Sequence, residues 1–154
     1  MSEKLLRISS DVEQEIKNID IIIQEPDKDT NNLLKLKLEL SGFINVITFS
    51  EFEKLLDFIN KGAGECLYVI NADFSSREWV KAVRKVAGDA ESPVIAITAF
   101  SSDDDVMNIM KTGVSDVLVK PFDMEIFLLK VEKVLTEFLY DRNLAETYRR
   151  NERL

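Results

Sequence analysis

The chain has 154 residues, of which 45% are hydrophobic and 31% are charged, a balance typical of one domain with its own core. Its net charge of -8 disfavours phosphate-rich partners, so we expect neither nucleic acid nor an anionic membrane surface as a ligand. The sequence has no histidine and one cysteine, Cys66, which excludes histidine-based catalysis and an internal disulfide. Because no apolar run reaches ~20 residues and no signal peptide is recognisable, we expect a cytoplasmic protein.

Residues 1–18 are predicted to be an N-terminal extension. Apolar residues at helical spacing and a Ser10–Glu13 capping box favour a helix there, and a loose tail is the open alternative. From residue 19 onward, short apolar runs alternate with segments whose apolar residues have helical spacing. The runs predict five buried strands, which begin at Ile19, Ile44, Cys66, Pro93 and Ser115. Strands alternating with helices predict a doubly wound α/β fold, a parallel sheet covered by helices on both faces.

Polar residues follow four of the predicted strands. In a doubly wound sheet, ligands bind beyond the carboxyl ends of the strands, so these residues are the candidates for a functional site. They are Gln24, Glu25 and Asp27 after the first strand, where Pro26 lies among them, Asn71 and Asp73 after the third, Thr98 after the fourth, and Lys120 after the fifth.

Two of these strand ends resemble a known family. The segments PVIAITAF at 93–100 and GVSDVLVKPF at 113–122 are similar to the fourth and fifth strands of the receiver domain of bacterial two-component response regulators. Thr98 falls on that family's hydroxyl position and Lys120 on its lysine. The resemblance covers residues 19–137 and implies a flavodoxin-like (βα)5 fold, a five-stranded parallel sheet in the order 2-1-3-4-5.

The resemblance also implies a function. Members of the family hold Mg²⁺ on an acidic pair after the first strand, and an aspartate at the end of the third strand takes a phosphoryl group from a histidine kinase. The hydroxyl and the lysine then contact the phosphoryl oxygens, and an aromatic residue on the fifth strand swings inward. In this chain the phosphoacceptor position is Asn71, and an amide cannot form an acyl phosphate. The aromatic switch position is Val117, which has no ring to move.

The acidic pair is incomplete as well. Aligned without a gap, the pair is Glu25 and Pro26; with a slip of one residue it is Gln24 and Glu25. In both alignments one carboxylate remains, and its charge is balanced by Lys120. We therefore expect no metal ion and no other cofactor, with Mg²⁺ binding lost or weak. Lys120 is expected to be satisfied by Glu25, Asn71 and Thr98, and the alternative is that it extends into solvent.

Asp73 is a possible substitute acidic residue. It lies two positions beyond Asn71, and at ~3.3 Å per residue we expect it not to meet Thr98 and Lys120 at one point. The predicted function is that of a pseudo-receiver, a non-enzymatic signalling module that acts by protein–protein contact. One alternative is an atypical response regulator phosphorylated on Asp73. Another is a small α/β enzyme using Glu25, Asp73 and Lys120, although no strong nucleophile or phosphate loop is placed at the site.

The surface that signals in the resembled family is formed by its fourth helix, fifth strand and fifth helix. Here we predict that this face is fixed in one state and contacts a protein partner or an output domain beyond residue 154. Residues 138–154 are predicted to be a helical extension or the start of a linker coiled coil that supports a homodimer. The predicted interface residues are Met107, Met110, Phe127, Phe138, Ala145 and Tyr148.

Overall fold

The computed structural model describes residues 11–73, 77–86 and 92–152. Residues 11–17 of the predicted N-terminal extension are helical, whereas the predicted cap at Ser10 lies outside the described residues. The strands are β1 (Asp20–Gln24), β2 (Val46–Phe49), β3 (Cys66–Asn71), β4 (Val94–Thr98) and β5 (Asp116–Val119). The helices are α2 (Lys28–Leu40), α3 (Phe52–Asn60), α4 (Arg77–Arg84), α5 (Asp103–Met110) and α6 (Met124–Glu152).

The five strands form one parallel sheet in the order β2-β1-β3-β4-β5. This order confirms the predicted flavodoxin-like topology, and each strand begins within two residues of the predicted start. β3 and β4 are buried along their whole length because they lie inside the sheet and are covered on both faces. β2 lies at the edge, and only its first residue, Val46, is buried.

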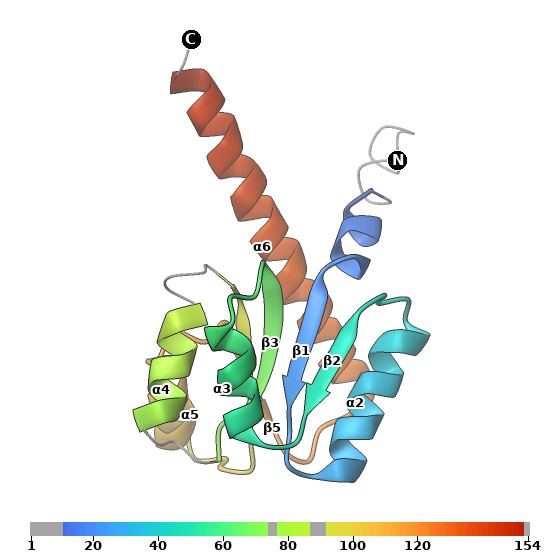
Figure 1. The fold of residues 1–154 in the computed structure, drawn as a ribbon, viewed down its shortest axis with the longest axis vertical. Coiled ribbons are helices and arrows are strands. Elements are labelled where there is room, and N and C mark those ends of the chain that lie inside the picture. The colour runs from blue at the N-terminus through green and yellow to red at the C-terminus, as the bar shows by residue number, and fades with distance from the viewer. Residues whose placement is uncertain (1–10, 74–76, 87–91, 153–154) are drawn as a thin grey trace.

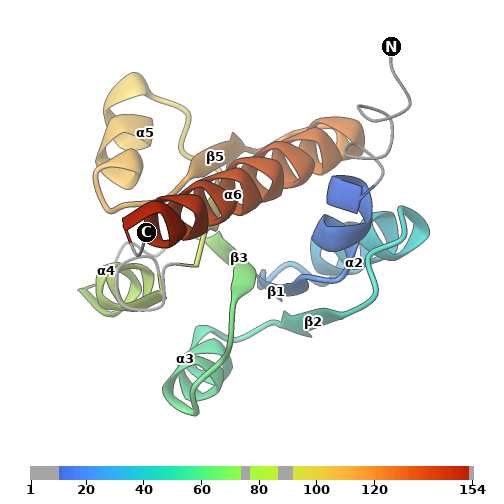
Figure 2. The ribbon, with the colours of Figure 1, turned by 90° about the horizontal axis from the view of Figure 1, so that it is seen from above.

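Helices cover both faces of the sheet (Figure 2). α2 and α6 lie on one face, where Leu34, Leu38 and Phe127 pack against one set of strand residues. α3, α4 and α5 lie on the other face, where Leu55 and Trp79 pack against the alternate set. Strand side chains point alternately to the two faces, so the two helical layers enclose two separate cores.

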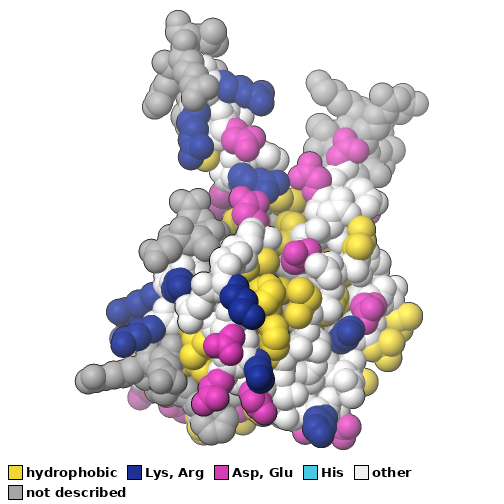
Figure 3. Space-filling view, viewed as in Figure 1, with side chains coloured by type: hydrophobic (Ala, Val, Ile, Leu, Met, Phe, Trp, Pro, Cys, Tyr) yellow, Lys and Arg dark blue, Asp and Glu magenta, His cyan; other side chains and the backbone are white. Residues whose placement is uncertain are grey.

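The sheet is less completely covered near its β2 edge. Figure 3 shows hydrophobic side chains exposed on the face between α3 and α2. Half-buried Ile47, Phe49 and Phe58 pack against the core on this side, and the rings of Phe49 and Phe58 lie 5.6 Å apart between centroids. Because β2 is an edge strand, its outer residues have neighbours on fewer sides than those of β3.

Side-chain caps fix two helix starts beside the carboxyl edge of the sheet. The Asp27 carboxylate accepts hydrogen bonds from the hydroxyl and the backbone N–H of Thr30 at the start of α2, and these bonds hold the pKa of Asp27 below its usual value. Ser102 accepts from the backbone N–H of Asp105 at the start of α5, whose first turn is acidic.

α6 is 29 residues long and has two parts. Its first half lies on the sheet, where Phe127, Val131 and Leu135 are fully buried. Its second half extends past the edge of the sheet opposite the polar strand ends (Figure 1), where Arg142 pairs with Glu65 at 2.5 Å. Within the described part of the chain, no helix is long and apolar enough to cross a membrane.

The prediction that Phe127 belongs to an exposed interface is wrong. Phe127 has no exposed surface and packs into the core between α6 and the sheet, since it lies on the inward side of the helix. Met107 and Met110, on α5, are 57% and 41% exposed, so the structure leaves them available to a partner. Val117 is buried within β5.

Candidate functional site

The predicted polar residues meet at the carboxyl edge of the sheet, which is the lower edge in Figure 1. Glu25 follows β1, Asn71 ends β3, Thr98 ends β4, and Lys120 follows β5. Because β1, β3, β4 and β5 are consecutive parallel strands, their last residues are brought to one place by the register of the sheet.

Glu25 is the centre of this site. Its side chain is fully buried and forms an ion pair with Lys120, whose side chain is 26% exposed. Asn71 donates its Nδ2 amide to both carboxylate oxygens of Glu25, at 3.2 and 3.4 Å, and the backbone N–H of Asp27 donates to Oε2 at 3.1 Å. A buried carboxylate requires such partners, since an unpaired charge away from water is strongly unfavourable.

Asn71 uses both ends of its amide. Its Nδ2 faces two carboxylates, those of Glu25 and of Asp73, with the Asp73 Oδ2 at 3.3 Å. Its Oδ1 accepts the backbone N–H of Asp73 at 3.0 Å. An aspartate at this position would offer oxygen atoms alone and would place a third negative charge between the other two. The amide therefore suits this site because it donates to acids that an aspartate would repel.

Asp73 reaches into the site and meets Thr98, one of the two residues that it was predicted not to meet at one point, whereas Lys120, the other, pairs with Glu25. Its Oδ1 accepts hydrogen bonds from the Thr98 hydroxyl at 3.0 Å and from the backbone N–H of Ala99 at 2.8 Å. The prediction assumed an extended chain after β3. Instead, the hydrogen bond from the Asp73 N–H to the Asn71 side chain forms a turn that brings Asp73 back toward β4.

This position of Asp73 changes the charge of the site. Two carboxylates, Glu25 and Asp73, face one ammonium, Lys120, so one negative charge is uncompensated where the sequence predicted none. The prediction for Lys120 is confirmed in its main partner, since its Nζ pairs with Glu25 and does not simply extend into solvent. Thr98, which was expected to contact Lys120, donates to Asp73 instead.

The structure also shows where the residues of both alignments of the acidic pair lie. The Gln24 side chain donates to the backbone carbonyl of Ser50 at 3.1 Å, and Pro26 is exposed. Glu25 is therefore the carboxylate that the end of β1 contributes to the site. Of its two neighbours, Gln24 faces the loop after β2 and Pro26 faces solvent.

One residue of this site was missed by sequence reasoning. Asn31 is buried on α2, and its Nδ2 donates to the backbone carbonyls of Glu25 at 3.0 Å and Phe49 at 3.2 Å. It thereby joins α2 to the ends of β1 and β2. The available signal was an amide at the buried helical spacing of Leu34 and Leu38, where an apolar residue is usual.

The side chains of this site are poorly suited to bind Mg²⁺. Among the described residues there is no group of three or more acidic, cysteine or histidine side chains that could hold a metal ion. Glu25 and Asp73 both face donors, namely the Lys120 ammonium, the Asn71 amide and the Thr98 hydroxyl, which a cation would have to displace. Loss of Mg²⁺ binding stays a prediction.

Comparison with known proteins identifies the family. The response regulator receiver domain matches residues 21–132, more than half of the chain. The transcriptional regulatory protein CpxR of Escherichia coli is 26% identical over 115 residues, and YxdJ of Bacillus subtilis is 30% identical over 114 residues. These alignments cover 75% and 73% of this chain but only 48% of each regulator, so the chain spans about half the length of these relatives.

A solved structure supports the same fold. The crystal structure of a response regulator from Thermotoga maritima superimposes with a TM-score of 0.67 at 22% identity, covering 77% of this chain and 98% of that one. The sheet order, the polar strand ends and the sequence match agree. The chain belongs to the response regulator receiver domain family of two-component systems.

Proposed function

We propose that this receiver domain signals by protein–protein contact without being phosphorylated. The observation that supports this function most directly is the amide of Asn71 at the end of β3, the position that holds the phosphoacceptor aspartate in the resembled family. An amide lacks the charged oxygen that attacks a phosphodonor. Both of its polar atoms are also engaged, with Glu25 and with Asp73.

A second candidate is phosphorylation of Asp73, because this carboxylate lies beside Thr98. Against it, Asp73 Oδ1 already accepts two hydrogen bonds and Oδ2 accepts one from Asn71. Phosphorylation there would have to break these bonds and add charge next to Glu25. An enzymatic role for Glu25, Asp73 and Lys120 has less support still, since Glu25 is fully buried and out of reach of a substrate.

Mass spectrometry separates these candidates. After incubation with acetyl phosphate and Mg²⁺, the mass of the wild-type chain is expected to stay unchanged. A gain of about 80 Da, one phosphoryl group, that is absent from an Asp73→Ala variant would contradict the proposed function and identify Asp73 as the phosphoacceptor. A gain that persists in that variant would place the acceptor elsewhere and would also contradict the proposed function.

The partner is proposed to be a protein: an output domain, another component of the pathway, or a second copy of this chain. Met107 and Met110 are exposed on α5, and methionine suits adaptable interfaces. On α6, Tyr140 is 67% and Leu144 is 43% exposed. We propose a homodimer through this face in the cytoplasm, with neither nucleic acid nor a membrane as a ligand.

The helical part of this proposed interface differs in detail from the predicted seam. Phe138 is half-buried against the core of its own domain, which leaves less of its ring for a partner. Ala145 is exposed, and the side chain of Tyr148 lies outside the described residues. Sedimentation of the intact chain and of a chain ending at Tyr140 tests the dimer. Dissociation only after truncation is expected, and monomers in both cases at tens of micromolar would contradict it.

A further inference from the structure

The end of β4 offers two hydrogen-bond donors that converge on one acceptor. The Thr98 hydroxyl and the Ala99 backbone N–H both donate to Asp73 Oδ1, at 3.0 and 2.8 Å. Thr98 is fully buried, and its hydroxyl can rotate to whichever acceptor is present. Hydrogen bonds to an ionised acceptor are roughly twice as strong as neutral ones, so Asp73 determines where this hydroxyl points.

Asp73 is itself held in place by the residue at the phosphoacceptor position. The Asn71 Oδ1 accepts the Asp73 backbone N–H at 3.0 Å, and the Asn71 Nδ2 donates to Asp73 Oδ2 at 3.3 Å. Asn71 therefore fixes both the backbone and the carboxylate of Asp73. The two residues act as one unit, in which Asn71 supplies the amide donor and Asp73 supplies the negative charge.

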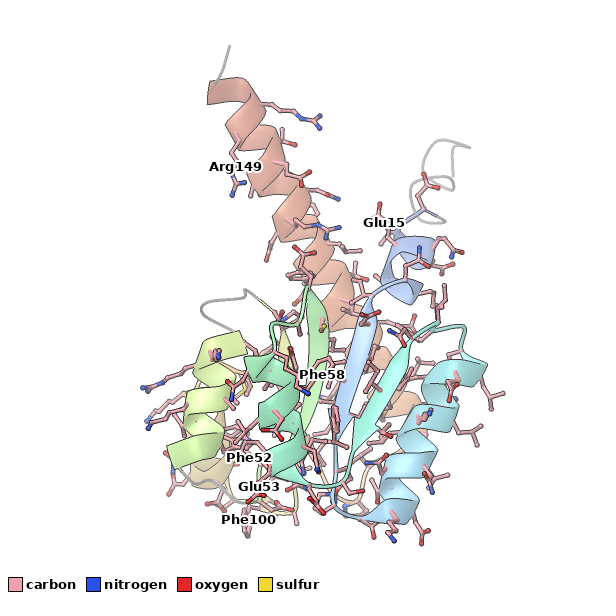
Figure 4. All side chains as sticks on the ribbon, in the orientation of Figure 1. Glu15, Phe52, Glu53, Phe58, Phe100 and Arg149 are labelled. Carbon is pink, nitrogen blue, oxygen red and sulfur yellow. The ribbon has the colours of Figure 1, made fainter. Side chains whose placement is uncertain are left out.

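The hydrogen bonds continue from Thr98 into the loop before α5. The Thr98 Oγ1 accepts the backbone N–H of Phe100 at 3.0 Å, so one hydroxyl links Asp73 to this loop. Phe100 is 48% exposed and lies at the lower edge of the domain (Figure 4). Together with Trp79 and Ile109 it lines a cavity of about 260 Å³ between α4 and α5. A hydrogen bond therefore links this surface to Thr98.

We infer that Asp73 is a positioning residue, a built-in carboxylate that holds Thr98 and the loop of residues 99–102 in one state. This inference rests on the proposed function, because a site that is never phosphorylated needs another group to orient the hydroxyl. Asn71 and Asp73 act together: an amide at position 71 is what allows a carboxylate from position 73 to approach Thr98. The surface around Phe100 is then constitutively set for its partner.

Amide hydrogen exchange followed by NMR tests the inference, with no phosphodonor present. In Asp73→Ala, the Ala99 amide is expected to exchange at least about tenfold faster, because it loses its charged acceptor. The Phe100 amide is expected to shift as the Thr98 hydroxyl turns away. The Tyr68 amide is the internal control, since it donates to the Pro93 carbonyl at 3.0 Å and lies outside the turn that Asn71 and Asp73 form.

Two further variants keep the test decisive. Asp73→Asn keeps an oxygen acceptor without the charge, so it is expected to lie between the wild type and Asp73→Ala. Thr98→Val should reproduce the Phe100 shift, and combining it with Asp73→Ala should add little. Unchanged Ala99 exchange in both Asp73 variants, or fully additive Phe100 shifts, would overturn the inference. Such a result leaves the mass measurement untouched, so the inference and the proposed function can fail separately.

Discussion

The buried carboxylate of Glu25 is paired with the ammonium of Lys120, and this pair joins the end of β1 to the end of β5 across β3 and β4. Lys120 is 26% exposed, so it can be partly hydrated, whereas the Glu25 side chain has no exposed surface. If the pair is lost, the loss of stability should therefore come mainly from the unpaired Glu25 carboxylate. A charge left behind in a buried site is more damaging than the pair is stabilising.

Lys120→Met is expected to lower the free energy of unfolding by about 3 kcal/mol, because Glu25 remains buried and loses its main partner. The matched control is the double variant Glu25→Gln with Lys120→Met, which removes both charges and should recover much of the loss. Urea unfolding of the wild type, Lys120→Met, Glu25→Gln and the double variant gives the coupling energy. Equal losses in the single and double variants would show that Glu25 does not depend on Lys120.

The second prediction separates the core from the exposed face of α5. Phe127→Ala is expected to cost about 3–5 kcal/mol of stability, because the ring is fully buried between α6 and the sheet. Met107→Ala removes a side chain that is 57% exposed and should change stability by less than about 0.5 kcal/mol. Chemical denaturation measures both. If Met107→Ala were the more destabilising change, the orientation of α5 or α6 would be wrong.

Most of the fold could be predicted from the sequence because central parallel strands are buried on both faces. Residues 66–70 and 94–97 are continuous apolar runs for this reason, and the polar residue that ends each run marks the carboxyl edge of the sheet. The pairing of Glu25 with Lys120 followed from the resemblance and from charge. These features depend on residue type and order, which a sequence displays directly.

The remaining features depend on geometry that residue order does not contain. Asp73 reaches Thr98 because a side-chain hydrogen bond to Asn71 turns the chain, whereas the spacing alone implied a separation. Phe127 lies on the inward side of α6, which its residue type does not predict, because the rotation of a helix about its axis is set by packing. The role of Asn31 could not be predicted because it donates to backbone carbonyls, whose positions a sequence does not show.

The third prediction concerns alkaline pH. Burial raises the pKa of the Cys66 thiol above its usual 9.0. The pKa of the Tyr68 hydroxyl is raised above its usual 10.0, mainly by burial and secondly by the neighbouring Cys66. Both groups are neutral when protonated, so the unfolded chain releases these protons at lower pH than the folded chain does. Stability should be unaffected by them below pH 9 and should fall as pH rises beyond it.

Each of these groups can contribute a slope of up to about 1.4 kcal/mol per pH unit within its own window. Tyr68→Phe and Cys66→Ala remove one group each and should make the decline above pH 9 shallower. Urea unfolding at several pH values measures the slope. A wild-type stability that stays level up to pH 11, or a slope that neither substitution alters, would contradict the assignment.

The last prediction concerns the amide itself. Asn71→Asp places a third carboxylate beside Glu25 and Asp73 and removes the donor that both accept at 3.2 and 3.3 Å. Without divalent cations the variant should lose about 2 kcal/mol of stability through repulsion and unpaired acceptors. Three carboxylates are the kind of ligand that Mg²⁺ prefers, so millimolar Mg²⁺ should restore much of this loss. The wild type should respond little, because its carboxylates are occupied by Lys120, Asn71 and Thr98.

Asn71→Ala is the control, since it removes the donor without adding charge and should stay insensitive to Mg²⁺. Thermal unfolding in EDTA and in Mg²⁺ compares the three proteins, and equal stabilisation of all of them would show that the ion binds elsewhere.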